Sequence, residues 1–149
     1  MSAFDIRADL TAPCTPGELF VYVDDLAAYP PWMQLVHAVS PVEDDDGRPA
    51  WSVELRARVG PLARSKRLRM VRTVHEPERR VVFERAEVDG REHSAWVLTA
   101  ALEPVDAGTD LEVVLHYGGG LWTGGVVERV LRDSIDKGRQ RLLELVAGS

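Results

Sequence analysis

Apolar residues recur with a helical period over the last long stretch of the chain. At about 100° per residue, one side of residues 123–146 collects the apolar side chains together with Ser134 and Gly138, and charged residues occupy the other side. The pattern predicts an amphipathic helix from Thr123 to Val146, with Thr123 as its N-cap. A glycine inside a helix costs roughly 1 kcal/mol relative to alanine. Gly138 therefore indicates either a very close packing partner or a space meant for a ligand.

The N-terminal part of the chain predicts one strand followed by short helical segments. Residues 4–10 alternate between apolar and polar side chains, as in a half-buried strand. Thr15, Pro16 and Glu18 have the spacing of a capped helix start, so we expect a helix from Pro16 to about Leu26. Prolines 30 and 31 lack a backbone donor and cannot continue this helix. We expect only a second short helical turn around them.

From residue 37 to residue 117 the hydrophobic period changes to two, which predicts about six further strands. Turn signals separate these strands, among them Asp46-Gly47, Gly60-Pro61 and Asp89-Gly90. The elements together predict an α+β fold with about seven antiparallel strands, two short helices after the first strand and one long C-terminal helix. A sheet that is apolar on one face needs a cover, and the C-terminal helix is the only predicted element long enough to provide it.

Composition narrows the class of protein. With 149 residues, 45% of them hydrophobic, we expect one domain over residues 1–149. No stretch is apolar enough to span a membrane and the start has no targeting pattern, so we expect a cytoplasmic protein. The net charge of −6 disfavours nonspecific binding of nucleic acid or anionic membranes. The single Cys14 and four separated histidines predict neither a metal site nor a cofactor.

Two stretches carry a family resemblance. The first runs from Asp24-Asp25-Leu26 to Tyr29-Pro30-Pro31-Trp32, and the second runs from Trp96-Val97-Leu98 through Glu103-Pro104 to Gly108-Thr109 and Leu111. With the element order, they resemble the helix-grip fold of the START, Bet v 1 and polyketide cyclase superfamily (SRPBCC). The resemblance covers nearly the whole chain. It implies a curved antiparallel sheet that grips the long helix around an apolar cavity for a lipid, polyketide or sterol.

The resemblance also makes a set of apolar residues candidates for the cavity wall, although the same residues would serve equally in a filled core. These candidates are Trp51, Val53, Leu55, Met70, Phe83, Trp96, Leu98, Leu115, Val130 and Leu131.

Five polar residues share the parity or helix face of these apolar positions, and they are the candidates for binding the polar end of a ligand. They are Arg72, Arg85, Ser94, Tyr117 and Ser134. In regular strands they would point to the concave side. The competing interpretation is that a bulge or strand end turns each arginine toward solvent, and that both serines are small packing residues. Tyr117 serves either as wall or as hydrogen-bond donor.

Two further segments suggest functional roles. Glycines cluster around Trp122, and we interpret Gly119, Gly120 and Trp122 either as a gate at the cavity mouth or as a plain flexible connection. A basic run covers residues 56–72, with no acidic residue between Glu54 and Glu76. The favoured interpretation is a solvated sheet face paired with acidic neighbours. The alternative is a docking surface for an anionic partner, such as an acyl-carrier protein or nucleic acid.

The leading hypothesis is a binding or transfer protein for a hydrophobic small molecule. One alternative is an enzyme resembling the polyketide aromatase/cyclases, which would close or dehydrate a poly-ketone chain held in the cavity. A further alternative is a protein-docking subunit that uses the basic outer face. No nucleophile motif is present, and the sequence names no catalytic residues. We expect no nucleic-acid partner, and a homodimer is compatible with the sequence.

Overall fold

The fold was obtained as a computed structural model, which describes residues 4–59, 61–118 and 125–148. Over these residues the chain forms seven strands, two α-helices and one 3-10 helix, in the order expected from the sequence. Their bounds are β1 Phe4–Ala12, α1 Pro16–Phe20, η1 Leu26–Ala28, β2 Val36–Asp45, β3 Arg48–Val59, β4 Leu62–Glu76, β5 Arg80–Arg85, β6 Ala95–Val105, β7 Gly108–Gly118 and α2 Gly125–Ala147.

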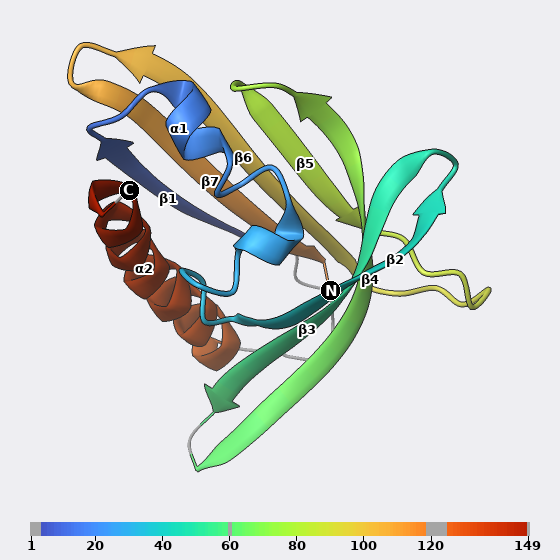
Figure 1. Cartoon of the computed structure of the whole chain (residues 1–149). Helices are drawn as coiled ribbons and strands as arrows, with labels where there is room; N and C mark the ends of the chain where they lie inside the picture. Colours follow the sequence, from blue (N-terminus) through green and yellow to red (C-terminus); the bar gives the residue numbers. More distant parts are fainter. Residues whose placement is uncertain (1–3, 60, 119–124, 149) are drawn as a thin grey trace.

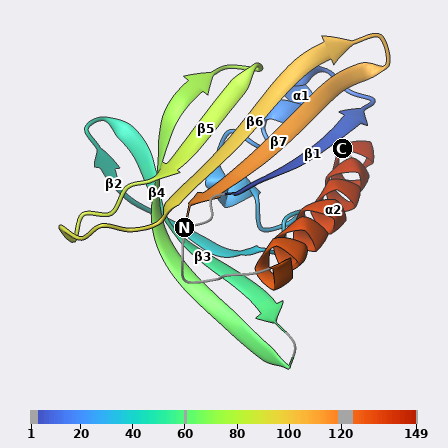
Figure 2. The same ribbon diagram turned by 180° about the vertical axis from the view of Figure 1, so that it is seen from behind.

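The strands form one antiparallel sheet in the order β1-β7-β6-β5-β4-β3-β2. β1 joins the sheet beside β7, with Ile6 opposite Leu115, although the two strands come from opposite ends of the chain. The sheet curves around α2, while α1 and η1 lie on the same inner side (Figures 1 and 2). This arrangement confirms the predicted α+β helix-grip architecture.

Local sequence signals account for two of the connections. Asp46 and Gly47 both have positive φ, 53° and 83°, as a two-residue β-hairpin turn requires. At the start of α1, the Thr15 hydroxyl accepts the backbone N–H of Glu18, and the Glu18 carboxylate accepts the N–H of Thr15. The predicted hairpin turn and capping box are therefore confirmed.

The predicted helix from Pro16 to about Leu26 is wrong in length, because α1 ends at Phe20. Side chains that follow it bind the backbone carbonyls that a longer helix would use for its own hydrogen bonds. The Trp32 indole Nε1 donates to the Tyr22 carbonyl at 3.0 Å, and the Tyr29 hydroxyl donates to the Val23 carbonyl at 2.9 Å. The chain then turns into η1 instead of extending α1.

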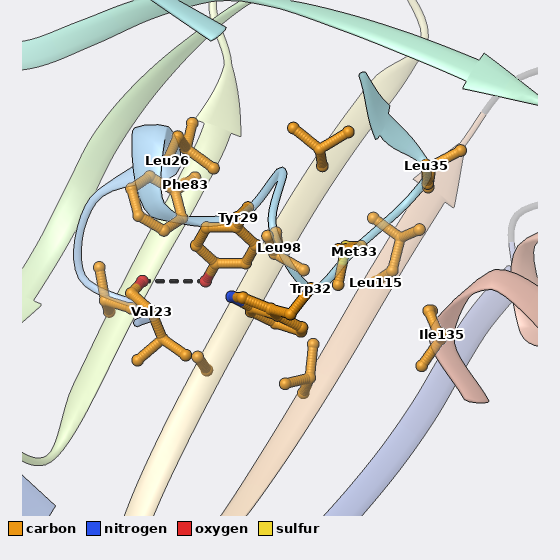
Figure 3. Close-up of a cluster of buried hydrophobic side chains, with 14 of the residues drawn as sticks. Val23, Leu26, Tyr29, Trp32, Met33, Leu35, Phe83, Leu98, Leu115 and Ile135 are labelled. Atoms are coloured by element: carbon orange, nitrogen blue, oxygen red, sulfur yellow. Dashed lines mark hydrogen bonds between the residues drawn. The ribbon is translucent and has the colours of Figure 1, made fainter. Parts of the chain in front are cut away.

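The inner face of the sheet is covered by more than the C-terminal helix. Residues 26–36, which we call the covering segment, cross the strands with their apolar side chains directed onto the sheet (Figure 3). Tyr29, Trp32, Met33 and Leu35 are all buried there. The expectation that α2 alone provides the cover is therefore corrected. The reason is that the buried side chains of this segment pack on the sheet, while hydrogen bonds of Tyr29, Trp32 and Leu35 hold it in place.

α2 packs against the covering segment through its smallest residues. A Cβ placed on Gly138 would lie 2.8 Å from the carbonyl oxygen of Trp32. One turn earlier, the Ser134 hydroxyl accepts the backbone N–H of Leu35 at 3.1 Å. Of the two explanations for small residues, close packing holds at Gly138. Ser134 contacts the same segment through this hydrogen bond, and its role in ligand binding stays a prediction. The predicted N-cap Thr123 lies outside the described residues.

Candidate functional site

A small, partly open cavity lies between the covering segment, the sheet and α2, and we call it the inner cavity. Its volume is about 40 Å³, whereas ligand pockets typically measure about 300–1,000 Å³. Its lining is apolar, and Figure 3 shows several of its side chains. The lining residues are Leu26, Met33, Leu35, Val36, Val53, Leu55, Leu68, Met70, Trp96, Leu98, Leu115 and Ile135.

Trp96, a residue of this apolar lining, carries a buried side-chain donor. The side chain is 4% exposed, and its Nε1 has no hydrogen-bond partner among the residues that the structure describes. A buried donor without a partner costs about 1–3 kcal/mol. Trp96 is the one residue of the described lining whose side chain carries a hydrogen-bond donor.

The sequence-predicted apolar residues divide into two groups. Val53, Leu55, Met70, Trp96, Leu98 and Leu115 line the inner cavity. Trp51, Phe83 and Leu131 are buried in the surrounding core without lining it, and the side chain of Val130 lies outside the described residues.

Some lining residues were missed by the sequence interpretation. Leu68 and Ile135 carried the correct periodicity and could have been included. Met33 and Leu35 had no usable signal, because they belong to an irregular segment whose side-chain directions do not follow from a helical or strand period.

Two of the predicted polar candidates hold parts of the fold together. The Arg72 guanidinium donates to the backbone carbonyl of Asp24 at 2.9 Å and so ties β4 to the loop before η1. A register shift between Arg72 and Val74 marks the irregularity that the sequence left open as an alternative. Ser134 binds the backbone of Leu35. Both side chains therefore already have protein partners in this closed arrangement.

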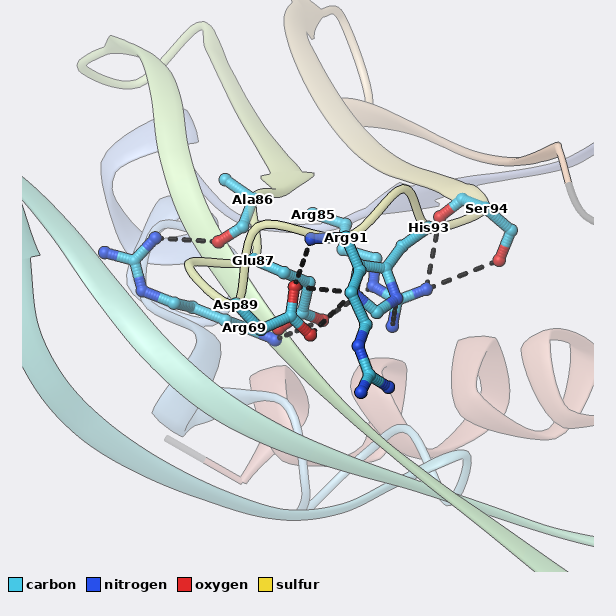
Figure 4. Close-up of polar contacts among 8 residues, drawn as sticks. All are labelled: Arg69, Arg85, Ala86, Glu87, Asp89, Arg91, His93 and Ser94. Atoms are coloured by element: carbon cyan, nitrogen blue, oxygen red, sulfur yellow. Dashed lines mark hydrogen bonds and ion pairs between the residues drawn. The ribbon is translucent and has the colours of Figure 1, made fainter.

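Arg85 and Ser94 come together in a second polar cluster at the end of β5 (Figure 4). Arg85 Nε donates to the Glu87 carboxylate at 2.7 Å, and its Nη1 donates to the carbonyl and hydroxyl oxygens of Ser94 at 3.2 and 3.3 Å. The Arg85 side chain is 7% exposed. Burial, with the charge of Arg85 as a second cause, lowers the pKa of the nearby Lys66. The cluster satisfies the donors of Arg85 internally, without a ligand.

Tyr117 is buried and its ring lies 4.6 Å from that of Trp96, measured between ring centroids. This contact makes Tyr117 part of the packing that holds the indole in place. The proposed gate residues Gly119, Gly120 and Trp122 lie outside the described residues.

The basic run is partly neutralised. On the outer face Arg67 approaches the Glu54 carboxylate at 3.5 Å, and Arg69 pairs with Asp45 at 3.2 Å. These pairs agree with the favoured interpretation of a solvated face with acidic neighbours. An acidic protein partner stays a prediction.

An open groove of about 640 Å³ lies outside the inner cavity, between the start of β2, the end of β3 and the first half of α2. We call it the α2–β3 groove. Its lining residues are Gln34, Leu35, His37, Arg56, Ala57, Ala63, Arg129, Asp133, Ser134 and Lys137. Leu35 belongs to both linings, so the groove and the inner cavity meet at this residue.

Within residues 4–59, 61–118 and 125–148, no group of three or more His, Cys, Asp or Glu side chains could hold a metal ion. None of the described helices is both long enough and apolar enough to cross a membrane.

A sequence profile for the family described as polyketide cyclase / dehydrase and lipid transport matches residues 3–147. The chain belongs to this family. The description covers both enzymes and lipid carriers, so membership supports an apolar small molecule as the ligand without deciding between binding and catalysis. No curated protein matches the chain in sequence.

Three solved structures share the fold of this chain over almost their whole lengths. A protein from Thermus thermophilus is 18% identical with a TM-score of 0.75, and the match covers 97% of this chain and 98% of that one. A START superfamily protein from Mycobacterium smegmatis is 16% identical, with a TM-score of 0.71 and 97% of both chains covered. The Zhui aromatase/cyclase from Streptomyces sp. R1128 is 12% identical with a TM-score of 0.70, covering 98% and 94%. At these identities the likeness shows the fold alone.

Proposed function

We propose that this protein binds a hydrophobic small molecule carrying an oxygen acceptor, with the apolar part in an enlarged inner cavity and the oxygen accepting a hydrogen bond from Trp96 Nε1. The observation that carries the proposal is the buried donor of Trp96, which has no described partner and belongs to a residue of the otherwise apolar lining. A ligand carbonyl or hydroxyl there would provide the hydrogen bond that the described protein groups do not. Ligand binding would thus recover part of the desolvation energy that folding leaves uncompensated.

Binding requires the inner cavity to grow, because about 40 Å³ cannot hold a lipid or polyketide. The covering segment is the part that can yield. It contributes Met33 and Leu35 to the lining, and its residues 29–35 belong to neither a helix nor a strand. Methionine also adapts readily to different shapes because it is unbranched. A shift of residues 29–35 away from β6 and β7 would enlarge the cavity. It would break the hydrogen bond from the Arg56 N–H to the Leu35 carbonyl, but it would leave the strand pairs from Val36 onward in place.

The lining favours binding over catalysis in this cavity. Cyclisation of a poly-ketone by aldol chemistry needs groups that donate and accept protons beside the reacting carbons. The described lining contains no carboxyl, histidine, lysine or other acid–base side chain. The polyketide cyclase alternative would be supported if the protein converted a poly-ketone thioester into an aromatic product.

The test uses 2-undecanone, which has one carbonyl on an apolar chain, and measures its affinity by calorimetry. Trp96→Phe keeps an aromatic ring and removes the donor, so we expect the affinity to fall about 5-fold, the equivalent of one hydrogen bond. The matched control is Trp51→Phe, the same change at a buried tryptophan that does not line the inner cavity. Equal affinities for the two variants would refute the role of Trp96, and no binding to the wild-type protein would refute the proposed function.

A further inference from the structure

Among the large described grooves, the α2–β3 groove has a distinct charge. The groove beside α1, β6 and β7 is lined by five carboxylates and one arginine, and the groove beside the β2–β3 turn by five carboxylates and two arginines. The α2–β3 groove is lined by the three cationic residues Arg56, Arg129 and Lys137, with Asp133 as its one described carboxylate. On a chain with net charge −6, this groove is the one that attracts an anion.

The arginines of this groove are available for a ligand. Asp133 pairs with Lys137 at 3.1 Å, which leaves no carboxylate in the described lining for the arginines. Within the described part of the chain, neither the Arg56 nor the Arg129 side chain forms an ion pair or hydrogen bond, and both residues are exposed. Their positive charges are therefore not neutralised by the described protein groups.

Leu35 separates this cationic groove from the apolar interior. Its backbone N–H donates to the Ser134 hydroxyl on α2, and its carbonyl accepts the backbone N–H of Arg56 on β3, at 3.1 and 2.9 Å. Leu35 thus bridges the gap between the helix and the sheet. The residues next to this bridge also divide between the two spaces. Ser134 and Ala57 line the groove, while Ile135 and Leu55 line the inner cavity.

We propose that the α2–β3 groove is the entrance to the inner cavity and the binding site for a carboxylate at the end of the ligand. The ligand class is then a long-chain keto or hydroxy acid, with its chain and oxygen inside and its carboxylate beside Arg56 and Arg129. The Leu35 N–H···Ser134 hydrogen bond is the latch that opens to admit it. This inference rests on the proposed function, because it assumes that the interior receives an apolar chain.

The test compares two ligands that differ only at one end. 10-Oxoundecanoate is 2-undecanone with its terminal methyl group replaced by a carboxylate, so both carry the same ketone and the same number of carbons. We expect the acid to bind about 10-fold more tightly at low salt, and the difference to shrink as salt screens the two exposed contacts. The double variant Arg56→Gln/Arg129→Gln should remove this preference and leave the affinity for 2-undecanone unchanged.

Arg141→Gln is the control, because Arg141 is an exposed arginine on α2 that lies outside the groove lining. It should keep the preference for the acid. Ser134→Ala removes the latch acceptor and should speed the association of both ligands about 2- to 10-fold, as expected for the loss of one hydrogen bond.

Equal affinity for the ketone and the acid, or a preference that survives the double arginine variant, would overturn the head-group site while leaving the proposed function standing. Unchanged association rates in Ser134→Ala would overturn the entrance at Leu35. Failure of both ligands to bind the wild-type protein would overturn the proposed function and this inference together.

Discussion

Replacement of Gly138 by alanine tests whether the covering segment is packed tightly against α2. In an exposed helix this change stabilises by about 1 kcal/mol, because alanine has the better helix propensity. Here the added Cβ would lie 2.8 Å from the Trp32 carbonyl oxygen, well below the 3.4 Å at which such contacts become ordinary. The Trp32 backbone would have to move by several tenths of an ångström.

That movement is resisted by specific bonds. The Trp32 indole donates to the Tyr22 carbonyl, and three residues later Leu35 is bound to Ser134. Overpacking of this kind costs about 1–3 kcal/mol. After subtraction of the helix gain, Gly138→Ala should lower the free energy of unfolding by about 1 kcal/mol. For a domain of this size, the melting temperature should fall by roughly 2–4 °C.

Urea denaturation measures this difference directly. Gln140→Ala is the control, since Gln140 is an exposed α2 residue and its replacement should change stability by less than about 0.5 kcal/mol. If Gly138→Ala instead stabilised the protein by the full helix-propensity gain of about 1 kcal/mol, the segment would not be tightly packed there. The variant should also admit 2-undecanone faster, because its closed arrangement is strained.

Three further changes test the packing and electrostatics of the fold. Thr15→Ala removes the capping-box acceptor and should lower the free energy of unfolding by about 1 kcal/mol in urea titrations. Tyr29→Phe leaves the buried Val23 carbonyl without its donor and should lower it by about 1–3 kcal/mol, measured the same way. Hydrogen bonds from two arginines hold the pKa of Asp45 below its usual 3.8. The ionised Asp45 carboxylate therefore stabilises the fold fully above pH 3.8, and this stabilisation disappears as the pH falls through the lowered pKa. Asp45→Asn should lower the free energy of unfolding at neutral pH, and this difference should vanish in acid.

The sequence predicted the fold well where its periodicity was regular. The strands and α2 followed from periods of two and 3.6, and the Asp46-Gly47 turn from its dipeptide. It failed where side chains from outside an element decide the structure. α1 is short because Tyr29 and Trp32 bind carbonyls beyond its end, and these contacts have no signal in the sequence of residues 16–23.

The candidate site shows the same division. Parity identified six residues of the inner cavity, because strand side chains alternate strictly between faces. Parity could not show that Arg85 turns to a carboxylate two residues along the chain, or that Arg72 binds a loop carbonyl. It also could not show that residues 26–36 occupy most of the expected cavity. These outcomes depend on contacts between segments distant in sequence, which periodicity does not encode.

A filled interior is compatible with the proposed binding function, because the closed state and the ligand-bound state would cover the sheet with similar apolar contacts. In the closed state the covering segment supplies apolar surface to the sheet, and in the bound state a ligand would supply it instead. The two states therefore bury similar apolar areas, so the hydrophobic contribution to their free-energy difference is small. Polar groups then decide which state is favoured. The closed state leaves Trp96 Nε1 without a described partner and Arg56 and Arg129 unpaired. Under the proposed binding mode, a ligand can contact all three groups at once only in the open state. The protein would then select its ligands by the positions of their oxygen atoms rather than by their chain length.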